Sequence, residues 1–162
     1  MDLEDVRDLL FRETFAATFD AATAELPSDR VNVSLDVERI ASPLQLQIIQ
    51  IPASPNDQAA GVAMYQFYVP IPIGVSEAAA DEVRRLLPAV NLVAPLMGFN
   101  LHEDEGFVYF RYVLLTPASA TAGPTIARTV WLIYFTLDNL AADVAEVAAG
   151  HRTAAQVLDD DA

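Results

Sequence analysis

Residues 91–116 read NLVAPLMGFNLHEDEGFVYFRYVLLT, and this stretch decides the fold of the chain. A polar, mainly acidic segment at 102–106, HEDEG, separates a short apolar segment from a long one. Its last residue, Gly106, can take the positive φ that closes a hairpin. The stretch therefore predicts the end of a helix, a short strand from Phe99, a tight turn, and a long strand that begins at Phe107.

The long strand is apolar on both of its faces. Successive side chains of a strand point to opposite faces of the sheet, so the strand carries two sets of residues. The first set is Phe107, Tyr109, Val113 and Leu115, and the second is Val108, Phe110, Tyr112 and Leu114. A strand that is apolar on both faces is covered on both faces. We expect the chain's own helices to cover one face, and a partner, a second subunit or a ligand to cover the other.

The rest of the chain predicts an α+β fold with the order α-β-β-β-α-β-β-α. The five strands and three main helices are expected from alternating and helical apolar spacing. The expected helices are residues 3–24, 77 to about 90, and 124–149, and the expected strands are residues 31–37, 44–51, 62–69, 99–101 and 107–116.

The first helix is predicted from apolar residues at helical spacing. Phe11, Phe15 and Phe19 lie on or beside this stripe, and Pro27 ends the helix. The Phe residues are interpreted as core, and alternatively as a face that binds a client protein.

Several local features are expected to interrupt the elements. A shift in the alternation at residues 48–49 predicts a β-bulge. Pro70 and Pro72 are expected to end the third strand, and Pro88 to kink or interrupt the second helix. Residues 53–61 are rich in turn formers and predict a loop.

The last long element is the one place where propensity and periodicity disagree. Residues 129–135, TVWLIYF, favour a strand by propensity. Apolar residues nevertheless recur at three- and four-residue steps over more than five turns, between Pro124 and Gly150, which predicts a helix. Thr153 is expected to cap a short helix that ends near Leu158, before a frayed acidic tail at residues 159–162.

The chain resembles the YbjN family in the order of residues that surround the hairpin. The matching features are Asn91-Leu92, residues 95–99 (PLMGF), the acidic turn with Gly106, and residues 108–112 (VYFRY). The resemblance implies the α+β fold of type III secretion chaperones, a five-stranded antiparallel sheet with three main helices, usually paired into dimers. It also implies a single domain over residues 1–162 with the acidic tail at its end. The family offers no catalytic residues to transfer.

Composition excludes several classes of enzyme. The chain contains no Cys, and all nine of its basic residues are Arg. Thiol nucleophiles, cysteine-bound zinc, P-loop and kinase lysines and Schiff bases are therefore excluded. The glycine patterns of dinucleotide-binding folds and serine hydrolases do not occur. We expect a protein that is not an enzyme and needs no cofactor or metal.

The net charge and the hydropathy of the chain limit the kinds of partner that it can have. The formal net charge of −14 repels nucleic acid and anionic membranes. No apolar run approaches the roughly 20 residues of a membrane helix, and the acidic start lacks the features of a signal peptide. We expect a soluble, cytoplasmic protein whose acidic surface mainly gives solubility, or alternatively steers a basic protein partner.

The candidate contact residues are aromatic. Because apolar surface exceeds what one small domain can bury, we predict a protein-binding module, chaperone-like or regulatory, that forms a homodimer or binds another protein. The predicted partner or dimer contacts are Phe107, Tyr109, Tyr112, Trp131 and Phe135.

The alternatives use polar residues. Arg111 is interpreted as a rim residue, or as the contact for the anion of a small ligand. The turn at residues 102–105 is interpreted as a solvated turn, or as the site of a divalent-metal sensor or enzyme that uses His102, Glu103 and Glu105. His151 is expected to complement the C-terminal end of the last long helix.

Overall fold

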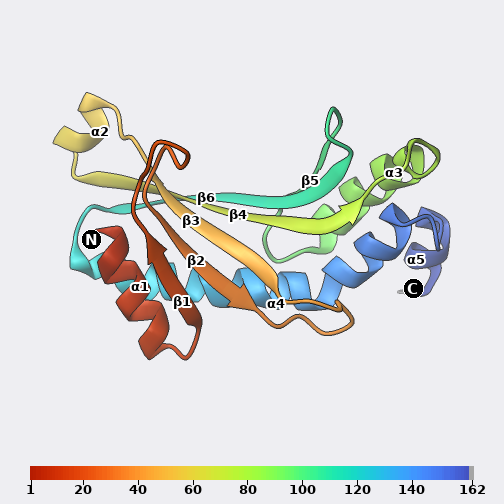
Figure 1. Ribbon diagram of the computed structural model, residues 1–162, viewed down its shortest axis with the longest axis horizontal. Helices are drawn as coiled ribbons and strands as arrows, with labels where there is room; N and C mark the ends of the chain where they lie inside the picture. The colour runs from red at the N-terminus through yellow and green to blue at the C-terminus, as the bar shows by residue number, and fades with distance from the viewer. Residues whose placement is uncertain (161–162) are drawn as a thin grey trace. The chain divides into compact units, whose positions relative to one another are not determined.

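A computed structural model describes residues 1–160 of the chain and shows an α+β fold with one antiparallel sheet (Figure 1). Within these residues the sheet has six strands, in the order β1-β2-β3-β4-β6-β5. The strands are β1 (Ala16–Asp20), β2 (Arg30–Leu35), β3 (Leu44–Ile51), β4 (Val62–Gly74), β5 (Phe99–His102) and β6 (Phe107–Pro117). The helices are α1 (Leu3–Arg12), α2 (Pro55–Ala59), α3 (Glu77–Val93), α4 (Gly123–Ala148) and α5 (Ala154–Asp160), with a 3₁₀ turn at Ala120–Ala122.

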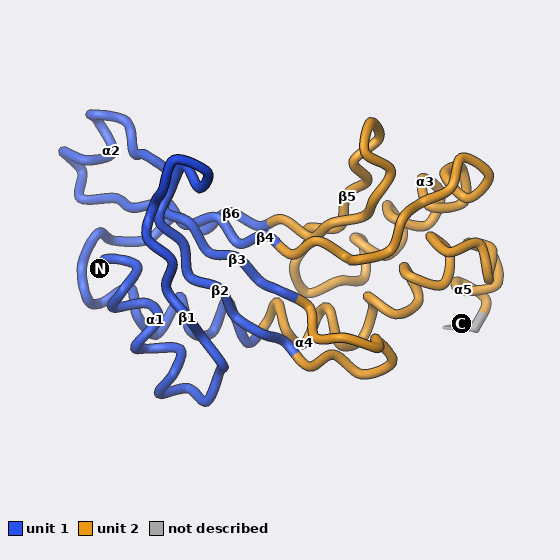
Figure 2. The backbone as a smooth tube through the Cα atoms, viewed as in Figure 1, with its two compact units in different colours: residues 1–35, 45–68, 112–131 blue, residues 36–44, 69–111, 132–162 orange. Residues whose placement is uncertain are grey.

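The chain divides into two compact units (Figure 2). Unit 1 comprises Met1–Leu35, Gln45–Tyr68 and Tyr112–Trp131, and unit 2 comprises Asp36–Leu44, Val69–Arg111 and Leu132–Ala162. Strands β4 and β6 and helix α4 each contribute residues to both units.

The first helix was predicted to run over residues 3–24, but it ends at Arg12. Residues 16–20 of the predicted helix instead form β1, the strand that the prediction of five strands lacks. Thr14 has a φ of 72°, which ends the helical path. Residues 16–20 then pair with β2, Ala17 opposite Val33 and Phe19 opposite Val31. Phe15 and Phe19 fit a helical stripe, but with Ala17 they also alternate at period two. Pairing with β2 therefore overrides the helical preference of this Ala-rich segment.

Two of the predicted interruptions are wrong. The pairing of β3 with β4 runs unbroken from Gln47 opposite Tyr68 to Ile51 opposite Met64, so no bulge interrupts this ladder. Strand β4 continues through Pro70 and Pro72, which alternate with the buried Val69 and Ile71 and therefore point away from the core.

The second helix and the loop that follows β3 also differ from the prediction. Helix α3 runs through Pro88, whose side chain is exposed, and ends at Val93, so Pro88 does not interrupt the helix, and a kink at Pro88 stays a prediction. The segment expected to be a loop at 53–61 contains α2, with Ser54 as the N-cap that accepts a hydrogen bond from the Asp57 N–H.

The hairpin and the long last helix are confirmed. Strands β5 and β6 pair from Phe99 opposite Phe110 to His102 opposite Phe107, and Gly106 has a φ of 63°. Residues 129–135 lie in α4, so periodicity and not strand propensity decides this segment.

Unit 1 has its core between one face of the sheet and two helical segments. Tyr65 and Phe67 of β4 are fully buried there, together with apolar residues of β2, β3, α1 and the first turns of α4. A Cβ added to Gly123 would lie 3.5 Å from side-chain atoms of Leu9 and Met1, so the start of α4 packs closely against α1. The main buried side chains are Val6, Leu10, Val31, Val33, Leu35, Leu46, Ile48, Ile126 and Val130.

Unit 2 has its own core around α3. Ser76 caps this helix by accepting a hydrogen bond from the Ala79 N–H. The core side chains are Val69, Ile71, Val83, Leu86, Leu87, Val90, Phe99, Val108, Phe110, Ile133, Leu137, Val144 and Val157.

The short last helix is tied to α3 in the same unit. Glu82 of α3 accepts a hydrogen bond from the backbone N–H of Ala154 at 2.9 Å. Thr153 accepts one from the Gln156 N–H, as its predicted capping role requires. Helix α5 extends to Asp160, two residues beyond the predicted end, and the rest of the predicted acidic tail, residues 161–162, lies outside the described residues.

Candidate functional site

The sheet has an outer face, opposite the buried core residues, that carries apolar side chains in each unit. In unit 1 the register places Ile49, Ile51 and Met64 on this face, where they are half-buried. Leu115 of β6 has 62% of its surface exposed. The shift of alternation at residues 48–49 thus reflects a strand with apolar residues on both faces.

In unit 2 the outer face carries an aromatic cluster, which we define as His102, Phe107 and Tyr109. The rings of His102 and Phe107 stack with their centroids 5.2 Å apart and their planes 15° from parallel. The Tyr109 ring lies 6.1 Å from Phe107 and 6.4 Å from His102. The hairpin register causes this grouping, because His102 is directly opposite Phe107 and Tyr109 is the next residue of β6 on that face.

The turn that follows His102 is held in place at its tip. The backbone N–H of Gly106 donates to the carbonyl of His102 at 2.8 Å, and the N–H of Glu105 donates to His102 Nδ1 at 3.3 Å. The carbonyl of Gly106 accepts from the Val75 N–H at 2.6 Å. These bonds fix the backbone of the turn and the orientation of the His102 ring.

An ion pair joins the same turn to α3. Arg84 donates to both carboxylate oxygens of Glu103, at 2.9 and 2.6 Å, and also to Asp81 at 2.7 Å. These hydrogen bonds lower the pKa of the Glu103 carboxyl and raise that of Arg84. All three side chains are exposed, so the pair positions the turn and adds little to stability.

The five predicted contact residues do not form one surface. Phe107 and Tyr109 come together in the aromatic cluster. Tyr112 points to the inner face, where its ring lies 6.4 Å from that of the buried Phe67.

The other two predicted contacts lie on α4. Trp131 is half-buried, its ring is 4.6 Å from that of Phe15, and its Nε1 donates to Glu13 at 3.3 Å. Phe135, in unit 2, has 55% of its surface exposed. The predicted contact roles of these residues stay predictions.

The polar candidates lie in separate surroundings. Arg111 is exposed and follows Tyr109 on the outer face, and its role as an anion contact stays a prediction. His102 Nε2 is 3.9 Å from the Glu105 carboxylate, whereas His151 Nδ1 is 3.4 Å from Glu146 at the end of α4. Among the described residues, no three His, Cys, Asp or Glu side chains come together so that they could hold a metal ion.

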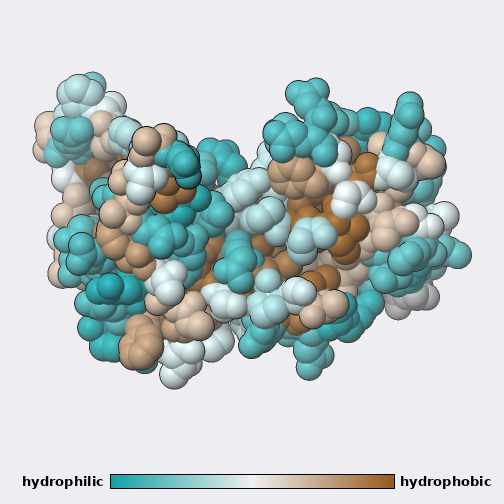
Figure 3. Space-filling model, in the orientation of Figure 1, coloured by the Kyte–Doolittle hydropathy of each residue, from teal (hydrophilic) through white to brown (hydrophobic). Residues whose placement is uncertain are grey.

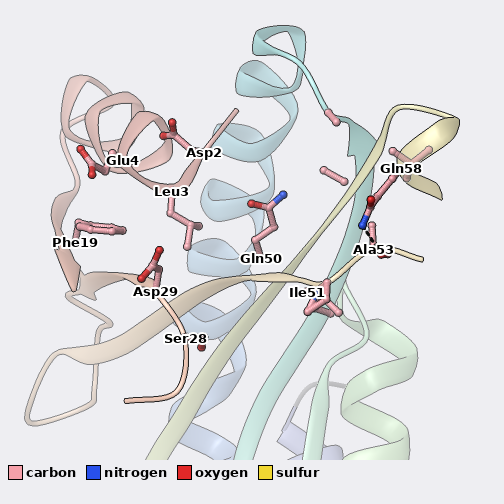
Figure 4. A pocket seen from close by; sticks show the side chains of 14 residues that line it. Asp2, Leu3, Glu4, Phe19, Ser28, Asp29, Gln50, Ile51, Ala53 and Gln58 are labelled. Carbon is pink, nitrogen blue, oxygen red and sulfur yellow. Dashed lines mark hydrogen bonds between the residues drawn. The ribbon is translucent and has the colours of Figure 1, made fainter. Parts of the chain in front are cut away.

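One cavity was not predicted from the sequence. It is a cleft of about 740 Å³ in unit 1, which we call the α1 cleft (Figure 4). The start of α1, the β1–β2 connection, the end of β3 and the segment around α2 form its walls. No sequence motif indicates this cleft, because the residues that line it are spread over five segments of the chain. These residues are Asp2, Leu3, Glu4, Phe19, Ser28, Asp29, Gln50, Ile51, Pro52, Ala53, Gln58, Val62, Ala63 and Ala118.

The surface in Figure 3 is mostly hydrophilic in that view, with hydrophobic residues gathered over unit 2. Neither a scan against models of protein families nor a search of curated proteins finds a match to the chain. None of the helices in residues 1–160 combines the length and the hydropathy that a bilayer crossing requires.

Proposed function

We propose that this chain is a non-catalytic protein-binding module, chaperone-like or regulatory, that buries apolar surface of a partner or of a second copy against its aromatic cluster. The observation that carries the proposal is the grouping of His102, Phe107 and Tyr109 on the outer face of unit 2. Membership of the YbjN family, the homodimer and a cytoplasmic location belong to the same proposal.

The chemistry of the cluster suits protein recognition. Aromatic side chains bury large areas with few rotatable bonds, and they are enriched among the residues that dominate binding energy. Phe107 and Tyr109 are only half-buried in the chain, so each still has surface to lose on binding. At about 25 cal/mol per Å² of apolar surface, two such rings supply on the order of 2–3 kcal/mol before ordering costs.

The surroundings of the cluster suit an interface rim. Arg111 lies beside the cluster on β6, and the turn at residues 103–105 is acidic and exposed. Interfaces commonly combine an apolar centre with a polar rim of this kind.

The test of the homodimer is sedimentation velocity over a wide range of concentration. We expect the wild type to be dimeric and the double variant Phe107→Ser/Tyr109→Ser to be monomeric. Phe11→Ser is the matched control, because Phe11 is an aromatic residue of α1 in unit 1, has 71% of its surface exposed and is not a member of the cluster. A wild type that stays monomeric at every concentration contradicts the homodimer.

The test of a different protein partner uses the same variants as baits. We expect a protein that is retained by the wild type and by Phe11→Ser and is lost with the double variant. Equal retention by all three baits would contradict a binding role for the aromatic cluster.

A further inference from the structure

The α1 cleft is concave, and its wall contains both apolar and acidic groups. Leu3 is buried, and Phe19 and Ile51 are half-buried, so these side chains form an apolar lining. Figure 4 shows the Leu3 side chain and the Phe19 ring directed into the space between α1 and the sheet, with the Gln50 amide between them and the far wall. The volume of about 740 Å³ exceeds one side chain and lies in the range of sites that bind organic ligands.

Every ionisable side chain of this lining is acidic. Asp2, Glu4 and Asp29 contribute carboxylates, and no Arg of the described chain lines the cleft. The carboxylate of Asp2 also acts on the hydroxyl of Tyr65, which lies nearby. Burial raises the pKa of the Tyr65 hydroxyl, and the carboxylates of Asp2 and Asp5 raise it further.

Two of the carboxylates are fixed by the backbone. Asp2 accepts a hydrogen bond from the Asp5 N–H at 2.8 Å in a capping box, and Asp29 accepts one from the Ala22 N–H at 2.7 Å. Each bond uses Oδ1 and leaves the second oxygen of the carboxylate for another donor. Gln58 is held as well, because its amide donates to the Ala53 carbonyl at 2.9 Å.

This combination selects a particular kind of partner. An Arg or Lys side chain has an aliphatic stem that packs on apolar walls and a cationic head that carboxylates bind. An aromatic ring such as that of Phe19 also attracts a cation over its face. A second copy of this chain, with its net charge of −14, is a poor source of such a segment.

We propose that the α1 cleft binds a basic polypeptide segment of a partner, with an Arg or Lys side chain directed to Glu4 and Asp29. The inference deepens the proposed protein-binding function and rests on it, and it specifies the charge of the partner. The aliphatic stem packs on Phe19 and Ile51, and the amides of Gln50 and Gln58 face the backbone of the segment.

The test measures fluorescence anisotropy with two labelled synthetic peptides of equal length, one of alternating Arg and Leu and one in which citrulline replaces each Arg. Citrulline keeps the shape of Arg and removes its charge. We expect the Arg peptide to bind the wild type at least about tenfold more tightly, a difference of about 1.4 kcal/mol. Equal binding of both peptides, or binding of neither, overturns the proposal.

Two double variants with the same change of charge locate the binding. Glu4→Gln/Asp29→Asn alters the cleft, and the Asn side chain keeps the oxygen that the Ala22 N–H needs. Asp8→Asn/Glu25→Gln is the control in the same unit, outside the cleft. We expect about tenfold weaker binding of the Arg peptide by the cleft variant and wild-type binding by the control. Equal weakening by both would assign the effect to net charge and overturn the proposal.

The aromatic-cluster variant separates this inference from the proposed function. If Phe107→Ser/Tyr109→Ser abolishes binding of the Arg peptide and the cleft variant does not, the cleft assignment is overturned and the protein-binding role stands. Loss of peptide binding only in the cleft variant supports the cleft. Failure of the proposed function is read independently, from the sedimentation and bait experiments. Circular dichroism and thermal unfolding of each variant verify that it is folded.

Discussion

Asn91 closes the connection between α3 and the hairpin, and its replacement by Ala is the most informative single change. Its Nδ2 donates to the Phe99 carbonyl at 2.8 Å, and its Oδ1 accepts from the N–H groups of Gly98 and Phe99, both at 3.0 Å. Gly98 and Phe99 are buried, so Ala at position 91 leaves two N–H groups without a partner in a place that water reaches poorly.

The magnitude follows from these three hydrogen bonds. Each contributes about 0.5–1.5 kcal/mol net, and a buried donor left unsatisfied adds a penalty. Ala in the last turn of α3 recovers roughly 0.5 kcal/mol of helix propensity. We therefore expect Asn91→Ala to lower the free energy of unfolding by about 3 kcal/mol, a large share of the 5–15 kcal/mol typical of domains.

The assay is urea unfolding followed by circular dichroism and by the fluorescence of Trp131, the single Trp of the chain. Asn139→Ala is the matched control, because Asn139 is exposed on α4 and makes one hydrogen bond, to the Phe135 carbonyl. Its effect should stay within about 0.5 kcal/mol. A loss of less than about 1 kcal/mol for Asn91→Ala would refute the reasoning, because it would mean that water or relaxation replaces all three bonds.

Three further predictions concern the same unit. Gly98→Ala should lower the free energy of unfolding by about 1–3 kcal/mol in urea, because a Cβ there would lie 2.6 Å from the Phe110 ring. Arg84 lowers the folded-state pKa of the Glu103 carboxyl below its ordinary value of 4.5. The stability that this carboxylate contributes should therefore be present above pH 4.5 and be lost as the pH falls through the lowered pKa. The measurement is Tm against pH for the wild type and Glu103→Gln. Calorimetric titration with zinc should give the same small heats for wild type and His102→Ala, since one imidazole at a hairpin turn is a poor metal site.

Each of these predictions has a clear contrary result. Gly74→Ala is the control for Gly98→Ala, because no atom lies within 4 Å of its added Cβ. Equal effects of the two substitutions would contradict the proposed clash. A wild type and a Glu103→Gln variant whose Tm values differ by the same amount at every pH would contradict the role of the ion pair. Zinc binding that disappears in His102→Ala would favour the metal-sensor alternative.

The hairpin could be predicted from the sequence because its signals are local. A glycine after an acidic turn and apolar residues on both sides of it are enough for β5, the turn and β6. Periodicity over more than five turns likewise decides α4 against the strand propensity of residues 129–135.

The remaining errors arise where distant residues decide the local structure. Residues 16–20 form a strand only because β2 pairs with them, and nothing within the segment specifies that partner. Pro70 and Pro72 come after Tyr68, where the pairing of β4 with β3 ends, so on that side their missing N–H groups cost no ladder hydrogen bond. The α1 cleft escapes prediction because its walls come from segments that only folding brings together.

The interleaved composition of the two units bears on how the chain can be shortened and how it folds. Each unit is assembled from three separate stretches, so no single cut releases either one as a continuous fragment. Residues near the amino terminus must find others more than one hundred positions away, as Glu13 and Trp131 do. Closing loops of that length before the contacts are formed slows the search for the native state, and we expect folding in milliseconds or longer, with autonomous folding only for the uncut polypeptide.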